Sequence, residues 1–140
     1  MGIATLPNCI TVAGLDTVSP VIKPYLYSSG GPYGKLSKPD LSAACVNVIS
    51  LNSDSNYISE KNGIKLYPRK LDVPYRTFTG SSIATAYISG LCALLCEKNP
   101  SITFNDMKSL LKVVCEPVED ISKAIQGEGT ININKLKLIP

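Results

Sequence analysis

The stretch TGSSIATAYISG, residues 79–90, joins a glycine and two adjacent serines to a long run of uncharged residues. A run of this length predicts a helix that begins at residue 82. Asn99-Pro100 is a typical helix end, so the helix is expected to span residues 82–99. Apolar side chains occupy nearly all of its faces, and its small residues allow close approach of neighbouring backbone. We therefore expect a helix at the centre of the fold, with residues 83–95 as its most buried part.

The composition is that of an ordinary globular domain. Of 140 residues, 44% are hydrophobic and 18% charged, and 14 Lys and Arg against 11 Asp and Glu leave a net charge of +3. The lysines are scattered, which favours a solvated surface and gives no footprint of a nucleic-acid or membrane partner. No apolar run reaches the length of a membrane span, and the N-terminus lacks the pattern of a signal peptide.

The five cysteines are predicted to be free thiols. Their odd number, wide spacing and apolar neighbours argue against a disulfide framework. Cys92 and Cys96 would share one helix face, but the chain has no histidine and no second close pair to complete a tetrahedral metal site. We therefore expect no metal and no cofactor, and reduced cysteines favour a cytoplasmic location.

Short runs of β-branched residues predict strands before the helix. They are CITVAGL (9–15), VNVIS (46–50) and YRTFTG (75–80). Between residues 56 and 78, two alternating runs around Asn62-Gly63 predict a hairpin. The first two strands carry no charge on either face, so we expect both to be covered on both sides, as in the sheet of an α/β protein.

A second helix is predicted to begin at Thr103. Thr103 and Asp106 form a variant of the capping box, and an apolar stripe follows at helical spacing, formed by Met107, Leu110, Leu111 and Val114. The sequence contains no internal repeat. We therefore interpret residues 1–140 as one partial domain, with the 56–78 hairpin within it.

Gly80, Ser81 and Ser82 lie where a predicted strand leads into the apolar helix. A hydroxyl at this position lies beside free backbone N–H groups and the positive end of the helix dipole, which favour a developing negative charge. That arrangement suits a nucleophile whose own N–H helps to hold an oxyanion. The alternative is structural, because either serine could be an N-cap of the helix.

The same stretch resembles the G-T-S-x-A-[ST]-P-x-V-[AS]-G signature of the subtilases, the subtilisin-like serine proteases. The matching positions are Gly80, Ser82, Ala84, Thr85 and Gly90. By this resemblance, Ser82 falls on the catalytic nucleophile. Ser81, Ala86 and Ile88 stand where the family has Thr, Pro and Val.

Five further stretches resemble the family in the same order: LPNCITVAGLD, YSSGGP, KPDLSAACVNVIS, NPSITFNDMKSLL and QGEGTININK. Ala44-Cys45 departs from the usual Pro-Gly. The chain is identified as a member of the family. The resemblance implies an α/β fold, namely the C-terminal part of a three-layer subtilisin-like fold. We expect a mostly parallel sheet, a β-hairpin and a buried central helix that starts at the nucleophile.

The resemblance implies hydrolysis of peptide bonds in a peptide or protein substrate through an acyl ester on Ser82, whose N–H is one oxyanion donor. Two roles remain open for Ser81, either support of the oxyanion pocket or capping of the helix. Gly80 is expected to make the turn before the nucleophile. Catalysis in the family also needs an upstream Asp and His. Since the chain has no histidine, we expect it to be inactive alone. The alternative is a degenerate, non-catalytic binding or regulatory module.

The resemblance also implies that the N-terminal half of the fold lies outside this chain. The inner edge of the sheet would then expose unpaired backbone groups. The N-terminal half could cover that edge, the chain could pair with itself as a two-fold dimer, or the fold could be altered. We expect that the folded chain is not a monomer, through pairing of the edge or exchange of the 56–78 hairpin.

Overall fold

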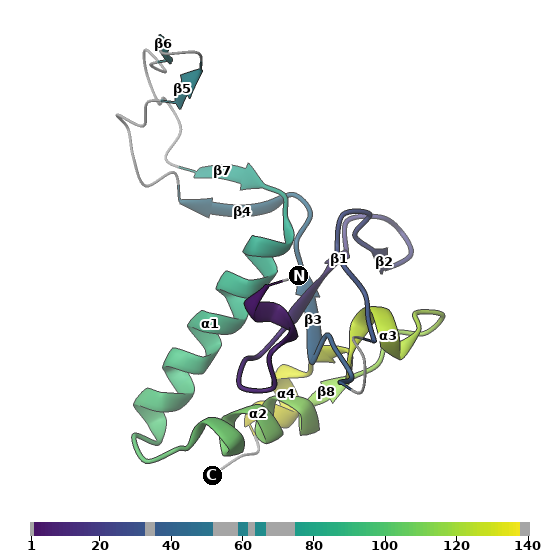
Figure 1. Ribbon diagram of the computed structural model, residues 1–140, viewed down its shortest axis with the longest axis vertical. Helices are drawn as coiled ribbons and strands as arrows, with labels where there is room; N and C mark the ends of the chain where they lie inside the picture. The colour runs from purple at the N-terminus through teal and green to yellow at the C-terminus, as the bar shows by residue number, and fades with distance from the viewer. Residues whose placement is uncertain (1, 33–35, 52–58, 62–63, 67–74, 138–140) are drawn as a thin grey trace.

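The computed structural model describes residues 2–32, 36–51, 59–61, 64–66 and 75–137 (Figure 1). The elements in chain order are η1 (Ile3–Thr5), β1 (Val12–Asp16), β2 (Lys23–Pro24), β3 (Leu41–Ala44), β4 (Val48–Leu51), β5 (Ser59–Lys61), β6 (Ile64–Leu66), β7 (Tyr75–Phe78), α1 (Ser81–Lys98), α2 (Phe104–Val113), β8 (Cys115–Glu116), α3 (Lys123–Gln126), β9 (Thr130–Ile131) and α4 (Ile133–Lys137).

The central sheet has five strands in the order β2-β1-β3-β9-β8. The inner strands β1, β3 and β9 run parallel, whereas β2 and β8 pair antiparallel at the two outer positions. β1 and β3 form the longest parallel pair, in register from Val12 opposite Leu41 to Leu15 opposite Ala44. This mixed, mostly parallel sheet with helices beside it confirms the predicted α/β class.

The core lies where α1 and α2 pack against this sheet. Leu41 and Ala43 of β3 share one buried cluster with Ala84 and Ile88 of α1 and with Leu111 of α2. α1 lies alongside β1 and β3, and α3 contacts β1 from the opposite side in the view of Figure 1. Helices cover both β1 and β3. The expected cover is therefore confirmed for the strand predicted at 9–15, whereas Leu41–Ala44 was not predicted as a strand.

α1 is the longest helix among the described residues, but it is not buried on every side. It begins at Ser81, one residue earlier than expected. Ala84 and Ile88 are its buried residues, whereas Tyr87 and Leu94 are 52% and 62% exposed. The expectation of a fully buried central helix is therefore wrong for this chain. One face of α1 packs on the sheet, and no described element covers the opposite face.

The strand expected at residues 46–50 is displaced. The buried strand is β3, and β4 follows it after a short break and pairs antiparallel with β7. Ile49 and Leu51 of β4 are 70% and 62% exposed. The lack of charge in VNVIS thus indicated a strand, but the expectation that it is covered on both faces is wrong. β5 and β6 pair antiparallel, and the expected turn at Asn62-Gly63 lies outside the described residues.

α2 forms as the sequence predicts. Thr103 is its N-cap: the hydroxyl oxygen accepts the backbone N–H of Asp106 at 3.2 Å and donates to the Asp106 carboxylate at 2.6 Å. Three residues of the predicted apolar stripe are buried and the fourth is half-buried. The capping box and the helical spacing together therefore located this helix correctly.

Candidate active site

The turn between β7 and α1 is built on Gly80. Its φ of +154° is a conformation that L side chains rarely adopt, so glycine is required here although the space around it is open. Its N–H donates to the carbonyl of Cys45, just after β3, at 2.8 Å, and its carbonyl accepts the N–H of Ile83 at 2.9 Å. These bonds fix the start of α1 next to the end of β3.

Ser81 and Ser82 occupy the first two positions of α1. Because Gly80 is the N-cap, neither serine caps the helix, and the capping interpretation of the pair is wrong. Ser82 is exposed and Ser81 is half-buried. The two neighbouring hydroxyls therefore have different surroundings, with Ser82 accessible from solvent.

The N-terminus of α1 carries an uncompensated positive end. Its first turn contains no acidic residue, and among the described residues no acceptor bonds to the N–H of Ser82. Free N–H groups at a helix start, together with the helix dipole, correspond to roughly half a positive charge. An oxyanion that forms on a group bonded to the Ser82 oxygen can therefore be stabilised by this positive helix end.

A cavity of about 380 Å³ opens beside Ser81, between α1, β1 and the N-terminal segment. Hydroxyl-bearing residues contribute much of its lining, among them Ser28, Ser29 and Thr85. The Thr85 hydroxyl donates to the carbonyl of Ser81 at 3.1 Å, and that of Ser28 accepts the N–H of Gly14 at 2.9 Å. These two hydroxyls are thus already bonded to backbone groups within the chain.

A second cavity of about 380 Å³ begins at Ile83, next to Ser82, and extends between α1 and β4. Its lining is mainly apolar and includes Val48, Phe78 and Tyr87. Ser81 therefore borders the first cavity, and Ile83, two residues further along the helix, borders the second. None of the described elements closes either cavity.

Comparisons with known proteins identify the family of this chain. The model of the subtilase family (Peptidase_S8) matches residues 3–129. The chain belongs to the subtilase family. Serine protease AprX of Bacillus subtilis (strain 168) is 37% identical to it over 108 residues, which are 76% of this chain and 23% of AprX. This subtilase chain thus spans about a quarter of the relative's length.

Solved structures share the fold. Fervidolysin from Fervidobacterium pennivorans has a TM-score of 0.74 at 20% identity, over 99% of this chain and 20% of that one. The CspB protease of Clostridium perfringens has a TM-score of 0.71 at 21% identity, over 97% of this chain and 28% of that one. At these identities the likeness concerns the fold alone, and it confirms the subtilisin-like fold predicted from the motifs.

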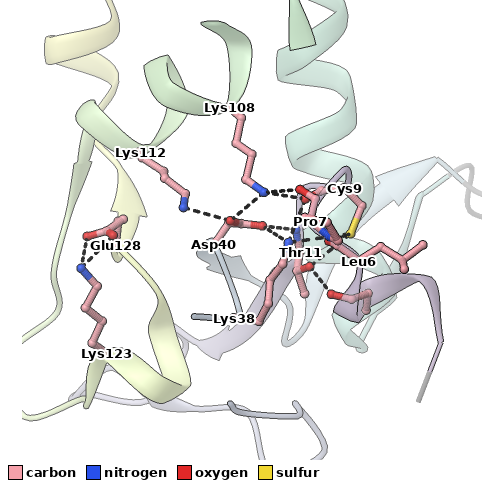
Figure 2. A network of polar contacts seen from close by, with 11 residues as sticks. Leu6, Pro7, Cys9, Thr11, Lys38, Asp40, Lys108, Lys112, Lys123 and Glu128 are labelled. Carbon is pink, nitrogen blue, oxygen red and sulfur yellow. Dashed lines mark hydrogen bonds and ion pairs between the residues drawn. The ribbon is translucent and has the colours of Figure 1, made fainter. Parts of the chain in front are cut away.

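Asp40 is the centre of a polar network in this subtilase chain that the sequence analysis missed (Figure 2). Its carboxylate accepts the N–H of Thr11 at 2.9 Å and lies 2.6, 3.2 and 3.0 Å from the Nζ atoms of Lys38, Lys108 and Lys112. The side chains of Asp40 and Lys38 are 1% and 2% exposed. The expectation of a solvated surface is therefore wrong for Lys38. The sequence feature that could have indicated this network is the pair Lys108 and Lys112, which lie one helical turn apart on the same face of α2.

The network shifts the acidity of its members. Burial opposes the charge of Asp40, but hydrogen bonds from Lys38 and Thr11 outweigh it, so the pKa of this carboxyl lies below its ordinary value. Burial likewise opposes the charge of Lys38, yet its hydrogen bond to Asp40 raises the pKa of the ammonium. For Lys108, burial and the nearby Lys38 outweigh the attraction of Asp40, and its pKa is lowered.

The described residues show neither a membrane span nor a cluster of metal ligands. No helix in this part of the chain has both the length and the apolar content to cross a bilayer. No group of three or more His, Cys, Asp or Glu side chains is placed to hold a metal ion. All five cysteines are free, and Cys45 and Cys115 are buried.

Proposed function

We propose that this chain supplies the nucleophile half of a peptide-hydrolysing site, as the C-terminal part of a subtilisin-like serine endopeptidase. The Ser82 oxygen attacks the carbonyl carbon of a peptide bond, and the amine product leaves behind an acyl ester that water hydrolyses. The observation that carries the proposal is the exposed Ser82 in the first turn of α1, with its own N–H free to stabilise the oxyanion.

Ser81 and Gly80 have supporting roles in this proposal. Ser81 contributes to the pocket around the oxyanion from its half-buried position, and Gly80 makes the turn that presents Ser82. The substrate is a peptide or protein, as expected for this family of proteases. No cofactor is needed for acyl transfer of this kind.

The chain alone is predicted to be inactive, because it contains no histidine that could take the Ser82 proton. The N-terminal half of the same fold would supply the Asp and His. The uncovered face of α1, with Tyr87 and Leu94 exposed, is an apolar surface on which that half could pack. This partner would then both complete the fold and bring the base to Ser82.

Activity-based labelling tests this proposal. The purified chain is treated with a fluorophosphonate probe, alone and after co-expression with the part of AprX outside the matched region. We expect labelling at Ser82 only in the complemented sample, its loss in Ser82→Ala, and its survival in the control Ser89→Ala, which changes an exposed serine further along α1. Rapid labelling of Ser82 in the chain alone would refute the need for a histidine base. Stable complementation without labelling would refute the nucleophile role.

The second candidate function is a degenerate subtilase module that binds or regulates without catalysis. Its support is the missing histidine together with Ala44-Cys45 and Ala86, where the family signature has Pro-Gly and Pro. A complemented chain that folds, binds peptides and does not react with the probe would favour this function over the first.

Self-association of the chain also remains a proposal. β2 pairs with Leu15 and Asp16 of β1, and the N–H of Tyr25 bonds to the carbonyl of Gly14 at 3.0 Å. These contacts cover part of the edge that the sequence analysis expected to be bare, so a two-fold dimer would pair around Val12. Light scattering at high micromolar concentration tests it, and a stable monomer would exclude edge pairing between copies.

A further inference from the structure

The segment that leads into the serine pair is tied to the loop after β3 at two neighbouring positions. The N–H of Gly80 donates to the carbonyl of Cys45 at 2.8 Å. One residue earlier, the hydroxyl oxygen of Thr79 accepts the N–H of Asn47 at 2.9 Å. The same hydroxyl lies 3.4 Å from the side-chain oxygen of Asn47, to which it can donate. Since β4 begins directly after this loop and β7 ends directly before Thr79, the contact continues the β4–β7 ladder toward α1 (Figure 1).

The loop after β3 is itself held by the central sheet. The N–H of Cys45 donates to the carbonyl of Leu15 in β1 at 3.0 Å, and the Cys45 side chain is fully buried. Its sulfur lies so close to Gly14 that an added Cβ there would be only 2.5 Å away. Asn47 has a φ of 51°, in the left-handed region that asparagine adopts more readily than most residues. The loop therefore offers Thr79 a donor whose position is set by the sheet.

The turn at Gly80 needs a restraint from outside. A glycine visits many backbone conformations, and a Cβ at this position would meet nothing within 4 Å, so no neighbouring atoms limit its rotation. The buried residues of α1 begin only at Ala84, after both serines. A rotation at Gly80 would therefore move Ser82 relative to the sheet before the packed part of the helix resists it.

We propose that Thr79 is a positioning residue for the nucleophile, an inference that rests on the proposed catalytic role of Ser82. Thr79 does not touch the reacting atoms. Its hydroxyl holds the turn at Gly80 against the loop after β3, and that turn sets where the Ser82 oxygen meets the carbonyl carbon of the substrate. A misplacement of about 1 Å can lower a reaction rate about 100-fold. Because the bond from Asn47 is exposed, its loss affects the rate more than the stability of the fold.

Amide hydrogen exchange in the chain alone tests whether Thr79 holds the turn. The ¹⁵N-labelled wild type is compared by NMR with Thr79→Val, which removes the hydroxyl and keeps the shape, and with Thr79→Ser, which keeps the hydroxyl. We expect the Gly80 amide to exchange about fivefold faster in the Val variant and at the wild-type rate in the Ser variant. The Met107 amide, bonded to the carbonyl of Thr103 in α2, should be unchanged because it reports a separate helix. An unchanged Gly80 rate in Thr79→Val, or an equal acceleration at Met107, overturns the proposal.

The matched control is Thr77→Val. Thr77 is an exposed residue of β7, two positions before Thr79, and its hydroxyl bonds to no other residue in the described part of the chain. The control therefore removes the same group from the same segment without touching the bond to Asn47. Exchange at Gly80 that is as fast in this control as in Thr79→Val would also overturn the proposal.

The rate of labelling at Ser82 tests the catalytic consequence. Fluorophosphonate labelling of the complemented chain is followed over a range of probe concentrations. We expect Thr79→Val to lower the maximal rate about tenfold and to leave the concentration at half-maximal rate unchanged, with Thr79→Ser and Thr77→Val close to wild type. A merely structural role would instead reduce the amount of reactive chain at an unchanged rate. Equal maximal rates in Thr79→Val and wild type, or no recovery in Thr79→Ser, overturn the inference.

The two measurements separate this inference from the proposed function. If the complemented wild type is not labelled, the nucleophile role of Ser82 fails, and amide exchange in the chain alone still decides whether Thr79 holds the turn at Gly80. If the wild type is labelled and Thr79→Val is labelled equally fast, the proposed function stands and the positioning role of Thr79 fails.

Discussion

Replacing Asp40 with asparagine removes one negative charge and keeps nearly the same side-chain volume. In the folded chain the Lys38 ammonium, 2% exposed, would then have no counter-charge, although its bond to the carbonyl of Cys9 at 2.8 Å remains. Lys108 and Lys112 are less affected, because their side chains are 18% and 34% exposed and can turn toward water. The cost of the substitution therefore falls mainly on the buried pair.

Removal of one partner from a buried ion pair typically costs about 3–5 kcal/mol. Domains of this size are stable by roughly 5–15 kcal/mol, so Asp40→Asn should lose a large share of the free energy of unfolding. With a urea dependence of about 1–3 kcal/mol per molar, the midpoint should fall by at least about 1 M. Urea unfolding followed by far-UV circular dichroism at pH 7 measures this shift.

The control is Glu128→Gln, which breaks an ion pair with Lys123, a residue 63% exposed, and should cost no more than about 1 kcal/mol. A loss in Asp40→Asn as small as that of the control would refute the reasoning. The pH dependence provides a second check. The pKa of Asp40 is lower in the folded chain than in the unfolded chain. The ionised carboxylate therefore makes its full contribution to the free energy of unfolding above the ordinary carboxyl pKa of about 3.9. That contribution is lost as the pH falls through the folded pKa. The Asn variant should lack this part of the acid dependence.

Three further substitutions and one chemical treatment give distinct outcomes. Gly80→Ala should destabilise the chain by about 1 kcal/mol or more, because alanine rarely adopts the positive φ of this residue. Gly90→Ala, in open space within α1, should stabilise the chain by up to about 1 kcal/mol. Thermal melts should therefore shift in opposite directions for the two variants. Leu111→Ala, at a fully buried position, should cost about 2–5 kcal/mol in urea unfolding, and a loss below about 1 kcal/mol would contradict the assigned core. Burial raises the pKa of the Cys115 thiol to about 11, so at pH 8 iodoacetamide should modify the exposed Cys96 well before it, as mass spectrometry of the digested chain can show.

Local signals in the sequence located most of the elements that position the candidate site. The strand before Asp16 and the helix after Thr103 follow from uncharged β-branched residues and from capping chemistry, both of which act over a few residues. The serine pair could be placed at a helix start for the same reason. The precise N-cap could not, since the choice between Gly80 and a serine depends on a φ that the hydrogen bond to Cys45 helps to set.

The errors concern burial, which depends on what covers an element. The apolar residues of α1 and β4 predicted a deep location, but no described element covers Leu94 or Ile49. Conversely, a lysine gives no local sign that it is buried. Lys38 is buried because Asp40, two residues further along, lies opposite lysines from α2, and this meeting is a property of the tertiary fold.

The bonds between Lys108 and the backbone before β1 have a consequence for how the chain is made. They join residues 101 and 99 positions apart, and Ser42 donates to the carbonyl of Gly129 across 87 positions. During synthesis, β1 and β3 leave the ribosome long before α2 and β9 exist. Their apolar faces therefore stay without their final neighbours until the last third of the chain has been synthesised. We expect this interval to be the one in which a nascent chain most needs a chaperone.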